Sequence, residues 1–581
     1  MTEDYRVDLL AGRNAESSDI TTSTDLLRSY RFRFADPTRE ISADPSKPII
    51  EREYLVGDLL QTWNDPSKGG KKPLAMLEMT ARTTKDQLDD SKSWLYNNPV
   101  TEGGDAFTNS VGLANQSHDL RLIEMSGWST APMIEWDAAE GEGSLGYGRG
   151  FFGASRTSYE GVTNVPMYRV PIAPAASLGD WIPANLIASR HLPRVVHPLG
   201  NSRAHPLIAS NRVFNPTLNE GNIPGLDHSY HLNDALWDRY YFSSVANLPA
   251  LPWISAQARS WQTVMRELIE GQRPALNPRI MSLTPAARAH ATISSLEAMT
   301  ARDRSRAMSS HLAIKGPFNV NSTSIDAWRA VLSSLRDQVI TGWGNTPLSQ
   351  PNESPFTRMA MPLAGPNQTT QDVNLEGQIR WAGFRSLTDA QIRQLAEAIV
   401  AQIRARGQLD QAPPLTLGEF VNRRVGAADQ LQSLAGILQS AIDQSGINSS
   451  MHVMDSKSVV VAQIPASRRR GVQTPEAMNG FTGEGTPSMV TQGDLMMLLA
   501  PIATVRGDTF KIRAYGDALG PDGVTVMARA WCEATVQRLP EWVDARESPQ
   551  VSVNDLQSVV NQRLGRRFQI TSFRWLQAKE L

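Results

Sequence analysis

The sequence has almost no cysteine and no long apolar run, and both absences restrict what the chain can be. Cys532 is the only cysteine in 581 residues, so no intramolecular disulfide can form. A helix that spans a bilayer needs about 18 to 20 apolar residues. The longest apolar candidate, residues 495–505, is shorter and contains Pro501. We therefore expect a soluble chain, long enough to be held together by a large hydrophobic core.

The sequence also lacks an excess of charge of either sign. It has 57 basic and 59 acidic residues, a formal net charge of −2. This balance predicts no general attraction to nucleic acid or to anionic membranes. The amino terminus is acidic and polar, without an apolar signal segment. Scarce cysteine fits a reducing compartment as well as many exported bacterial proteins, so composition leaves the compartment open.

Strongly specific catalytic motifs are missing too. No Walker loop occurs, and no triad or carboxylate pair can be assembled, so the sequence indicates no catalytic and no cofactor-binding residue. Residues 141–146 and 148–153 match the dinucleotide fingerprint as strings of letters. Acidic residues precede them and glycines and aromatics follow, whereas the motif requires a strand before and a helix after. We interpret them as surface loop.

The histidine-rich segment near residue 230 offers the best candidates for a metal site. His228 and His231 lie three residues apart, and Asp234 follows, so on a helix some of these side chains could share a face. Histidine and carboxylate ligands bind metals in this way. Strongly specific metal spacings are absent, however. A hydrogen-bonded structural role is the favoured interpretation, and metal binding is the alternative.

Two helices are predicted after residue 255. Residues 256–270 place five apolar side chains on one stripe, and Gly271 is a plausible stop. The five are Trp261, Val264, Met265, Leu268 and Ile269. A second helix is expected to begin with Thr284 as its cap and Pro285 as its first residue, the preferred arrangement at a helix start.

Residues 316–446 carry the clearest helical pattern. Ser324 is predicted to begin a helix, and Thr388 with Gln391 matches a capping box. Apolar residues then recur at helical spacing up to Gly407, which we expect to be a left-handed cap. A further helix is predicted to end at Gly446. These helices are expected to pack on one another.

The carboxyl-terminal part of the sequence changes to period two. Residues 509–515 and 524–537 alternate apolar and polar side chains, which predicts strands with one buried face. Turn residues 521–523 lie between them, so the two should pair antiparallel. Residues 567–575 read as a last strand. Cys532 falls on the apolar side, so we expect it to be buried and unreactive.

Five consecutive regions follow from these patterns. Residues 1–185 are rich in short extended segments, among them a strand within 73–82, and in loops at 96–115 and 138–165. Residues 186–310 form a mixed region rich in histidine and aromatics, 311–450 a helical domain, 451–490 a linker and 491–581 an antiparallel β region. The expected fold class is α+β, with antiparallel sheets and an inserted helical domain.

Several blocks resemble known families. Residues 316–332 (GPFNVNSTSIDAWRAVL) resemble the segment that opens the helical, helix-hairpin-helix-like insertion of the type II secretion minor pseudopilin K. Residues 387–407 and 415–421 resemble the elements that follow it there, and residues 508–516 and 528–538 resemble its closing strands. Helix-hairpin-helix modules often bind nucleic acid, but the arginines here are scattered over a face expected to be solvated.

Most of the chain resembles the protein A family of the pilin-like Verru_Chthon gene cassettes. The resembling blocks are residues 74–82 (LAMLEMTAR), 199–207 (LGNSRAHPL), 227–244 (DHSYHLNDALWDRYYFSS) and 565–575. The resemblance implies a pseudopilin-like fold and a place in the cell envelope or outside the cell. It further implies other pilin-like cassette proteins as partners, no nucleic acid, and a membrane anchor only through a segment absent from this sequence.

The hypothesis is therefore a non-catalytic structural subunit of a pilus-like or type II secretion-like apparatus. It predicts an exposed apolar or aromatic patch. One alternative is a metal-dependent envelope hydrolase, which predicts that His228, His231 and an aspartate converge. Another is an adhesin or glycan-binding module that uses exposed Trp and Tyr from the amino-terminal half.

Overall fold

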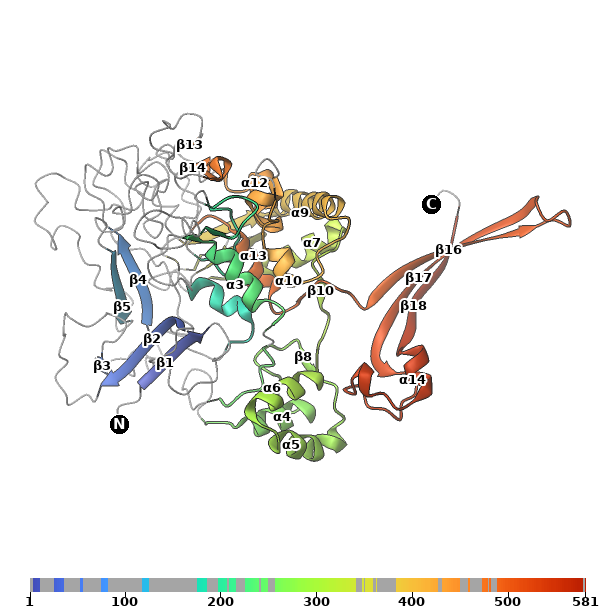
Figure 1. Cartoon of the computed structure of the whole chain (residues 1–581), viewed down its shortest axis with the longest axis horizontal. Coiled ribbons are helices and arrows are strands. Elements are labelled where there is room, and N and C mark those ends of the chain that lie inside the picture. Colours follow the sequence, from blue (N-terminus) through green and yellow to red (C-terminus); the bar gives the residue numbers. More distant parts are fainter. Residues whose placement is uncertain are drawn as a thin grey trace, which may run out of the picture. The chain divides into compact units, whose positions relative to one another are not determined.

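The computed structural model describes the backbone of five amino-terminal strands and most of the chain from residue 175 onward (Figure 1). The described residues are 4–10, 26–35, 53–55, 75–81, 118–124, 175–184, 197–205, 208–215, 225–239, 242–248, 257–340, 347–348, 351–358, 362, 383–426, 431–449, 458–459, 473–478, 480–481, 488–577 and 580. The expected loops at 96–115 and 138–165 and the glycine strings lie outside them.

The fold is α+β, and the chain divides into two compact units, each discontinuous in sequence. Residues 1–240 and 321–501 form the first unit, and residues 241–320 and 502–581 form the second. This grouping differs from five consecutive regions, because segments far apart in the sequence pack together. Most described strand pairs are antiparallel; β2–β3 and β10–β15 are parallel.

Five strands are described in the amino-terminal part of the first unit. β1 (Asp4–Leu10) pairs antiparallel with β2 (Leu26–Ala35), which pairs parallel with β3 (Glu53–Leu55). β4 (Ala75–Ala81) pairs antiparallel with β5 (His118–Glu124). β4 confirms the strand predicted within residues 73–82.

Helices form the core of the first unit, where α9 (Asp389–Leu409) packs against its neighbours (Figure 1). These neighbours are α7 (Ile325–Leu332), α12 (Ile437–Ser445) and β12 (Phe384–Thr388). In turn, α12 contacts α10 (Leu417–Val421), α11 (Leu431–Leu434) and α13 (Gln492–Leu499), and β12 pairs antiparallel with β11 (Glu353–Thr357). Trp328 of α7 has no exposed surface and stacks on Phe420 of α10, with 6.5 Å between ring centroids.

Local capping signals position two of these helices as predicted. The hydroxyl of Ser324 accepts a hydrogen bond from the amide of Ala327 at the start of α7. Thr388 and Gln391 form the predicted capping box at the start of α9. Each cap satisfies amides that have no partner within the helix, which stabilises the helix by about 1 kcal/mol.

One glycine assignment and the continuity of one helix are corrected in this region. Gly407 is not a left-handed cap, because α9 continues through it to Leu409. The helix predicted to end at Gly446 does end there, with φ at +66°, but it is broken between α11 and α12. Gly436 lies at the break, and its amide donates to the carbonyl of Ser202. Backbone from a distant segment, rather than helical propensity, sets the interruption.

The break requires glycine because the chain crowds Gly436. A Cβ added there would collide with the carbonyl oxygen of Val421 and lie 2.5 Å from Oε1 of Gln492. The same addition at Gly407 meets nothing within 4 Å. Crowding therefore requires glycine at residue 436, whereas a larger side chain fits at residue 407.

Part of the segment expected to be a linker also packs in the first unit. The hydroxyl of Thr474 donates to the carbonyl of Ile208 at 2.7 Å, and Met489 and Val490 are buried. Four further described strands and two 3-10 turns are short elements of this unit. They are β6 (Phe214–Asn215), β7 (Gly225–Leu226), β13 (Ser458–Val459), β14 (Gly480–Phe481), η8 (Leu178–Ala184) and η15 (Pro475–Met478).

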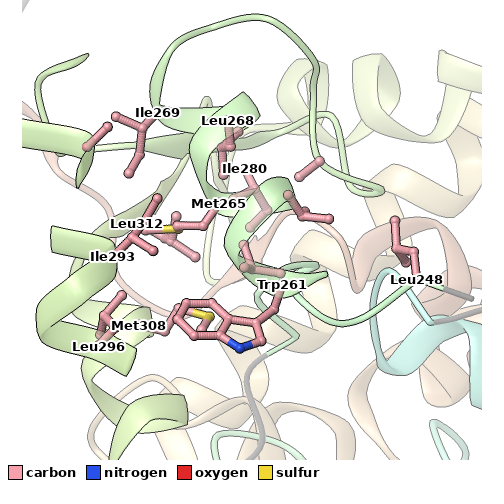
Figure 2. Packing of buried hydrophobic residues seen from close by; sticks show 14 residues of the cluster. Leu248, Trp261, Met265, Leu268, Ile269, Ile280, Ile293, Leu296, Met308 and Leu312 are labelled. Atoms are coloured by element: carbon pink, nitrogen blue, oxygen red, sulfur yellow. The ribbon is translucent and has the colours of Figure 1, made fainter. Parts of the chain in front are cut away.

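The second unit begins with a small helical layer around an apolar core (Figure 2). α4 (Trp261–Ile269), α5 (Ala289–Glu297) and α6 (Ala301–Ser310) pack with the antiparallel pair β8 (Ile280–Ser282) and β9 (Leu312–Ile314). All five apolar residues of the predicted stripe on α4 are buried, and Gly271 has φ at +70°. The apolar stripe and the stop at Gly271 are confirmed, whereas the helix begins at Trp261, capped by Ser260, rather than at residue 256.

The helix start predicted at Thr284 and Pro285 is wrong. Pro285 is extended, the 3-10 turn η9 (Ala286–Arg288) follows, and α5 begins at Ala289. Thr284 is buried, and its hydroxyl lies 2.9 Å from Nδ1 of His311. A tertiary hydrogen bond thus occupies the oxygen that would otherwise cap a helix.

The rest of the second unit is built on a three-stranded antiparallel sheet in the order β16–β17–β18. Its strands are β16 (Thr509–Leu519), β17 (Val526–Trp542) and β18 (Arg566–Leu576), which confirm the three predicted strands and their antiparallel pairing. The remaining elements are β10 (Phe318–Asn319), β15 (Ala503–Thr504), α14 (Val559–Leu564), η10 (Ser333–Leu335, in the first unit) and η16 (Val553–Asp555). Figure 1 shows the hairpin of β16 and β17 extending past the end of β18.

Substitution of the two glycines should separate crowding from helical propensity. We expect Gly436→Ala to lower the free energy of unfolding by about 1–3 kcal/mol, because the new methyl group meets backbone. Gly407→Ala is the matched control and should raise it by about 0.5–1 kcal/mol. Denaturant unfolding followed by tryptophan fluorescence measures both. Equal shifts for the two variants would contradict the packing described for Gly436.

Candidate functional site

The histidine-rich segment forms a helix start in the first unit. α3 (His228–Leu236) follows Asp227, whose Oδ1 accepts a hydrogen bond from the amide of Tyr230 at 3.0 Å. His228 is buried in the first helical position. His231 is exposed, and its Nε2 lies 3.2 Å from the carbonyl oxygen of Val213.

The remaining aspartates of this segment have other contacts. Asp234 is exposed and lies 3.7 Å from Arg239. The carboxylate of Asp238 accepts from the amides of Leu417 and Gly418 at 3.0 and 2.9 Å, at the start of α10. In the part of the chain that the structure describes, no three His, Cys, Asp or Glu side chains are gathered as a metal site would need.

Asp227 forms a buried ion pair with Arg423. Nε of Arg423 lies 2.9 Å from Oδ2 of Asp227, and the arginine side chain has no exposed surface. Its other nitrogens donate to the carbonyls of Ser210 at 2.9 Å and Arg212 at 2.7 Å. A buried guanidinium is tolerated when its charge is paired and its protons are bonded in this way.

Amide side chains extend this polar core between the blocks singled out in the sequence. Oδ1 of Asn233 accepts from the amide of Gly200 at 2.8 Å, and its Nδ2 donates to the carbonyl of Asn201 at 2.7 Å. Gln492 donates to the carbonyls of Gly200 and Val421 at 2.9 and 2.8 Å. The polar residues of 199–203 and 227–238 thus hydrogen-bond to each other and to α10 and α13. Their role in these contacts is to hold the segments of the fold together.

Removal of Arg423 should test how much this core depends on the ion pair. We expect Arg423→Ala to lower the free energy of unfolding by about 3–5 kcal/mol, since it leaves the Asp227 carboxylate buried without its cation. Arg393→Ala is the control, because Arg393 pairs with Glu397 at 2.9 Å on an exposed helix surface. It should leave unfolding unchanged. If Arg423→Ala lowered the free energy of unfolding no more than Arg393→Ala does, the core would not depend on this ion pair.

The sheet of the second unit carries the second candidate feature, an apolar face. In an antiparallel pair, residues opposite each other project from the same face. The register places Ile512 opposite Ala534, and Ala534 opposite Phe573. This face, here called the apolar sheet face, consists of Phe510, Ile512, Ala514, Gly516 and Ala518 on β16; Ala528, Ala530, Cys532, Ala534, Val536 and Arg538 on β17; and Phe568, Ile570, Phe573 and Trp575 on β18.

A bulge on β18 gathers its large residues on that face. Thr535 pairs with Ser572 and the next residue, Val536, pairs with Ile570, so Thr571 is an extra residue. Each extra residue reverses the alternation of faces along a strand. Without it, Phe573 and Trp575 would project from the opposite side to Phe568 and Ile570. The alternation of apolar and polar residues in the sequence does not predict this bulge.

The large residues of the apolar sheet face are exposed. Ile512, Ile570 and Trp575 keep 50, 63 and 68% of their surface accessible. The prediction of a buried face is therefore wrong, and Cys532 is half-buried rather than buried. The period of two reports which side chains share a face, whereas burial needs a second layer to cover it.

The opposite face of the same sheet is polar and organised by Glu533. Its buried carboxylate lies 2.8 Å from Nε of Arg513 on β16 and 3.1 Å from Nε of Arg574 on β18. Lys511 approaches at 3.5 Å. The hydrogen bond from Arg513, followed by that from Arg574, lowers the pKa of Glu533 below its usual value. Tyr515 and Trp531 lie beside this network, 5.6 Å apart.

Acid should weaken this cross-strand network in a defined direction. Because the pKa of Glu533 is lower in the folded state, its ion pairs stabilise the fold above the ordinary carboxyl pKa of 4.5 and are lost as pH falls through the folded value. We expect Glu533→Gln to melt at a lower temperature than the unchanged chain at pH 7. The difference should shrink as pH falls below 4.5. Melting curves across pH measure it, and a difference independent of pH would contradict it.

Comparison with known proteins adds no assignment to these features. No protein-family model matches the chain, and neither the curated proteins nor the solved structures contain a match. Among the described residues, no helix is both long and apolar enough to cross a membrane.

Sequence reasoning found the segments that carry both features but not their chemistry. Arg423 carries no signal in the sequence, because an arginine followed by Arg424 gives no sign that one of the two is buried. The alternation in 524–537 indicated an apolar side of the sheet. The contribution of β18 and the exposure of the whole face came from the register and the packing.

Proposed function

We propose that this chain is a non-catalytic structural subunit of a pilus-like or type II secretion-like cell-envelope apparatus, acting through protein–protein contacts. The apolar sheet face is the observation that carries the proposal. Monomeric soluble proteins rarely expose contiguous apolar patches beyond a few hundred Å², and larger patches mark interaction sites. Four aromatic and two isoleucine side chains of this face are each at least 39% exposed.

The resemblance of residues 74–82, 199–207, 227–244 and 565–575 to the Verru_Chthon protein A family supplies the kind of apparatus. On that basis the partners are other pilin-like cassette proteins, and the location is the cell envelope or the outside of the cell. The pseudopilin-like assignment of the α+β fold belongs to this proposal as well. The last resembling block includes β18, which supplies most of the large apolar residues.

The hydrolase alternative has less support than the structural one. His228 lies buried at a helix start, His231 faces a backbone carbonyl, and Asp234 faces Arg239. Asp227 and Asp238 bind Arg423 and the start of α10. The glycan-binding alternative concerns side chains of the amino-terminal half, which lie outside the described residues for the most part.

Assembly with cassette proteins tests the proposal. Co-expressed with the other pilin-like proteins of its cassette, the chain should co-purify with them. Ile570→Asp combined with Phe573→Asp should abolish the complex, because two charges would be buried at the contact. Gln569→Asp combined with Ser572→Asp is the matched control, since these exposed residues project from the polar face of the same strand.

The control should co-purify as well as the unchanged chain. Absence of any cassette protein from the purified chain would refute the proposed function. An equal loss in both double variants would also refute it, since that result would point to damage of β18 rather than to the apolar sheet face.

A further inference from the structure

The sheet β16–β17–β18 has two edges, and β16 provides a long and regular one. In the part of the chain that the structure describes, β16 pairs with β17 alone, and each of its eleven residues is exposed. Edge strands are normally protected by proline, by bulges or by short length. β18, at the other edge, contains the extra residue Thr571. β16 has no proline, and the extra residue of its pair with β17, Met527, belongs to β17.

Such an edge presents backbone groups that can pair with another strand. Alternate residues of an edge strand direct their amides and carbonyls away from the sheet. A strand added at the edge takes up these groups, and its backbone hydrogen bonds supply affinity while side chains select the partner. The side chains of β16 therefore indicate which strand fits beside it.

The charges of β16 are arranged so that the strand complements itself. Its bases, Lys511 and Arg513, precede its middle residue, Ala514, and its one acid, Asp517, follows. In a pair of antiparallel copies with Ala514 opposite Ala514, Lys511 of each copy lies opposite Asp517 of the other. Arg513 then lies opposite Tyr515. Opposite charges attract in such cross-strand pairs, whereas like charges directly opposite each other repel.

We propose that two copies of this chain pair edge to edge through β16, around a two-fold axis that is perpendicular to the sheet at Ala514. A half-turn about this axis reverses strand direction, so the two three-stranded sheets join as one antiparallel sheet. Two-fold interfaces of this kind bring the same surface of both subunits together. The proposal does not rest on the proposed function, because it uses the edge of the sheet rather than the apolar sheet face.

Charge and length together select the register. An axis at Arg513, or at the residue before it, sets cations opposite cations. An axis at Tyr515 sets Arg513 opposite Asp517, but it leaves the first residues of β16 without a partner in the strand. Ala514 is the middle of residues 509–519, so an axis there pairs the whole strand. Antiparallel pairing gives about one hydrogen bond per residue pair, hence about ten bonds.

The charged groups of this register are accessible to a second strand. The side chain of Lys511 is 63% exposed and lies 3.5 Å from Glu533. Asp517 is exposed, accepts from the hydroxyl of Tyr515 at 3.1 Å and lies opposite Arg529 of β17. In the dimer Asp517 therefore lies between a cation of β17 and a cation of the other copy. Glu533 is held among cations from both sides in the same way.

The same register suits the apolar sheet face. A half-turn about the perpendicular axis keeps the apolar sheet faces of both copies on one side. It sets Phe510 opposite Ala518 and Ile512 opposite Gly516, so each large side chain meets a small one across the junction. The two faces become one continuous apolar surface, which stays available to the partners of the proposed function.

Thiols introduced at and near the axis test the register. In a Cys532→Ala background, Ala514→Cys should form an intermolecular disulfide when oxidised with diamide, because directly opposite Cβ atoms lie about 5 Å apart. Ile512→Cys is the matched control. Its two thiols would lie about 14 Å apart, four residues along the paired strands, which is beyond the reach of a disulfide. Non-reducing electrophoresis of the full-length chains measures both.

Exchange of the paired charges tests the contact. At concentrations up to about 100 µM, the unchanged chain should sediment at twice the mass of one chain. Asp517→Lys should weaken dimerisation about tenfold, since it sets lysine opposite Lys511 twice in each dimer. Asp555→Lys, the same change at an exposed residue outside the sheet, should have no effect. Adding Lys511→Glu to Asp517→Lys should restore the dimer. The two positions lie about 20 Å apart in one copy, so they meet only across the pair.

A chain that sediments as a monomer would overturn the proposal. Equal disulfide formation at positions 512 and 514 would overturn it, and so would a double variant that stays as weak as Asp517→Lys. These outcomes are distinguishable from failure of the proposed function, because Ile570→Asp and Phe573→Asp change β18 and leave β16 intact. A chain that co-purifies with cassette proteins but sediments as a monomer would keep the function and exclude the dimer.

Discussion

A guanidinium without solvent exposure must find a partner for its charge and for its protons within the protein, and Arg423 finds them on three other segments of the chain. Its charge pairs with Asp227 at the start of α3, and its protons go to carbonyls at residues 210, 212 and 433. The backbone amide of Arg423 donates to the hydroxyl of Ser202. Segments separated by about two hundred residues are thereby fixed to one another. The packing of α10, α12 and α13 around Gly436 and Gln492 depends on that arrangement.

The same constraint decides what the histidine-rich segment can do. Asp227 caps α3 and pairs with Arg423, and Asp238 accepts hydrogen bonds from the amides at the start of α10. Polar residues that resemble a ligand set in the sequence serve to satisfy buried backbone and a buried charge. The proposed interaction surface lies in the second unit, where a sheet separates polar and apolar side chains on opposite faces. One face holds Glu533 among three cations, and the other exposes aromatic and isoleucine side chains.

Local signals predicted elements well where the deciding contacts are themselves local. The capping box at Thr388 and the stripe on α4 depend on residues within a few positions of each other, and the hairpin of β16 and β17 joins two segments that are adjacent in the sequence. Predictions failed where a distant group intervened. Thr284 binds His311 instead of capping a helix, and Gly436 interrupts a helix because Val421 and Gln492 approach it. At Gly407 no such contact exists, and the helix runs on.

The sequence by itself determined the α+β class, the positions of its most periodic helices and strands, and the apolar side of β17. Periodicity fixes these because side-chain direction repeats with the backbone geometry. Only the tertiary structure decided that Arg423 is buried, that Thr571 aligns the large residues of β18 on one face, and that this face is exposed. Burial and register are properties of chain segments brought together from far apart. Neither burial nor register can therefore be predicted from the sequence immediately around the residues concerned.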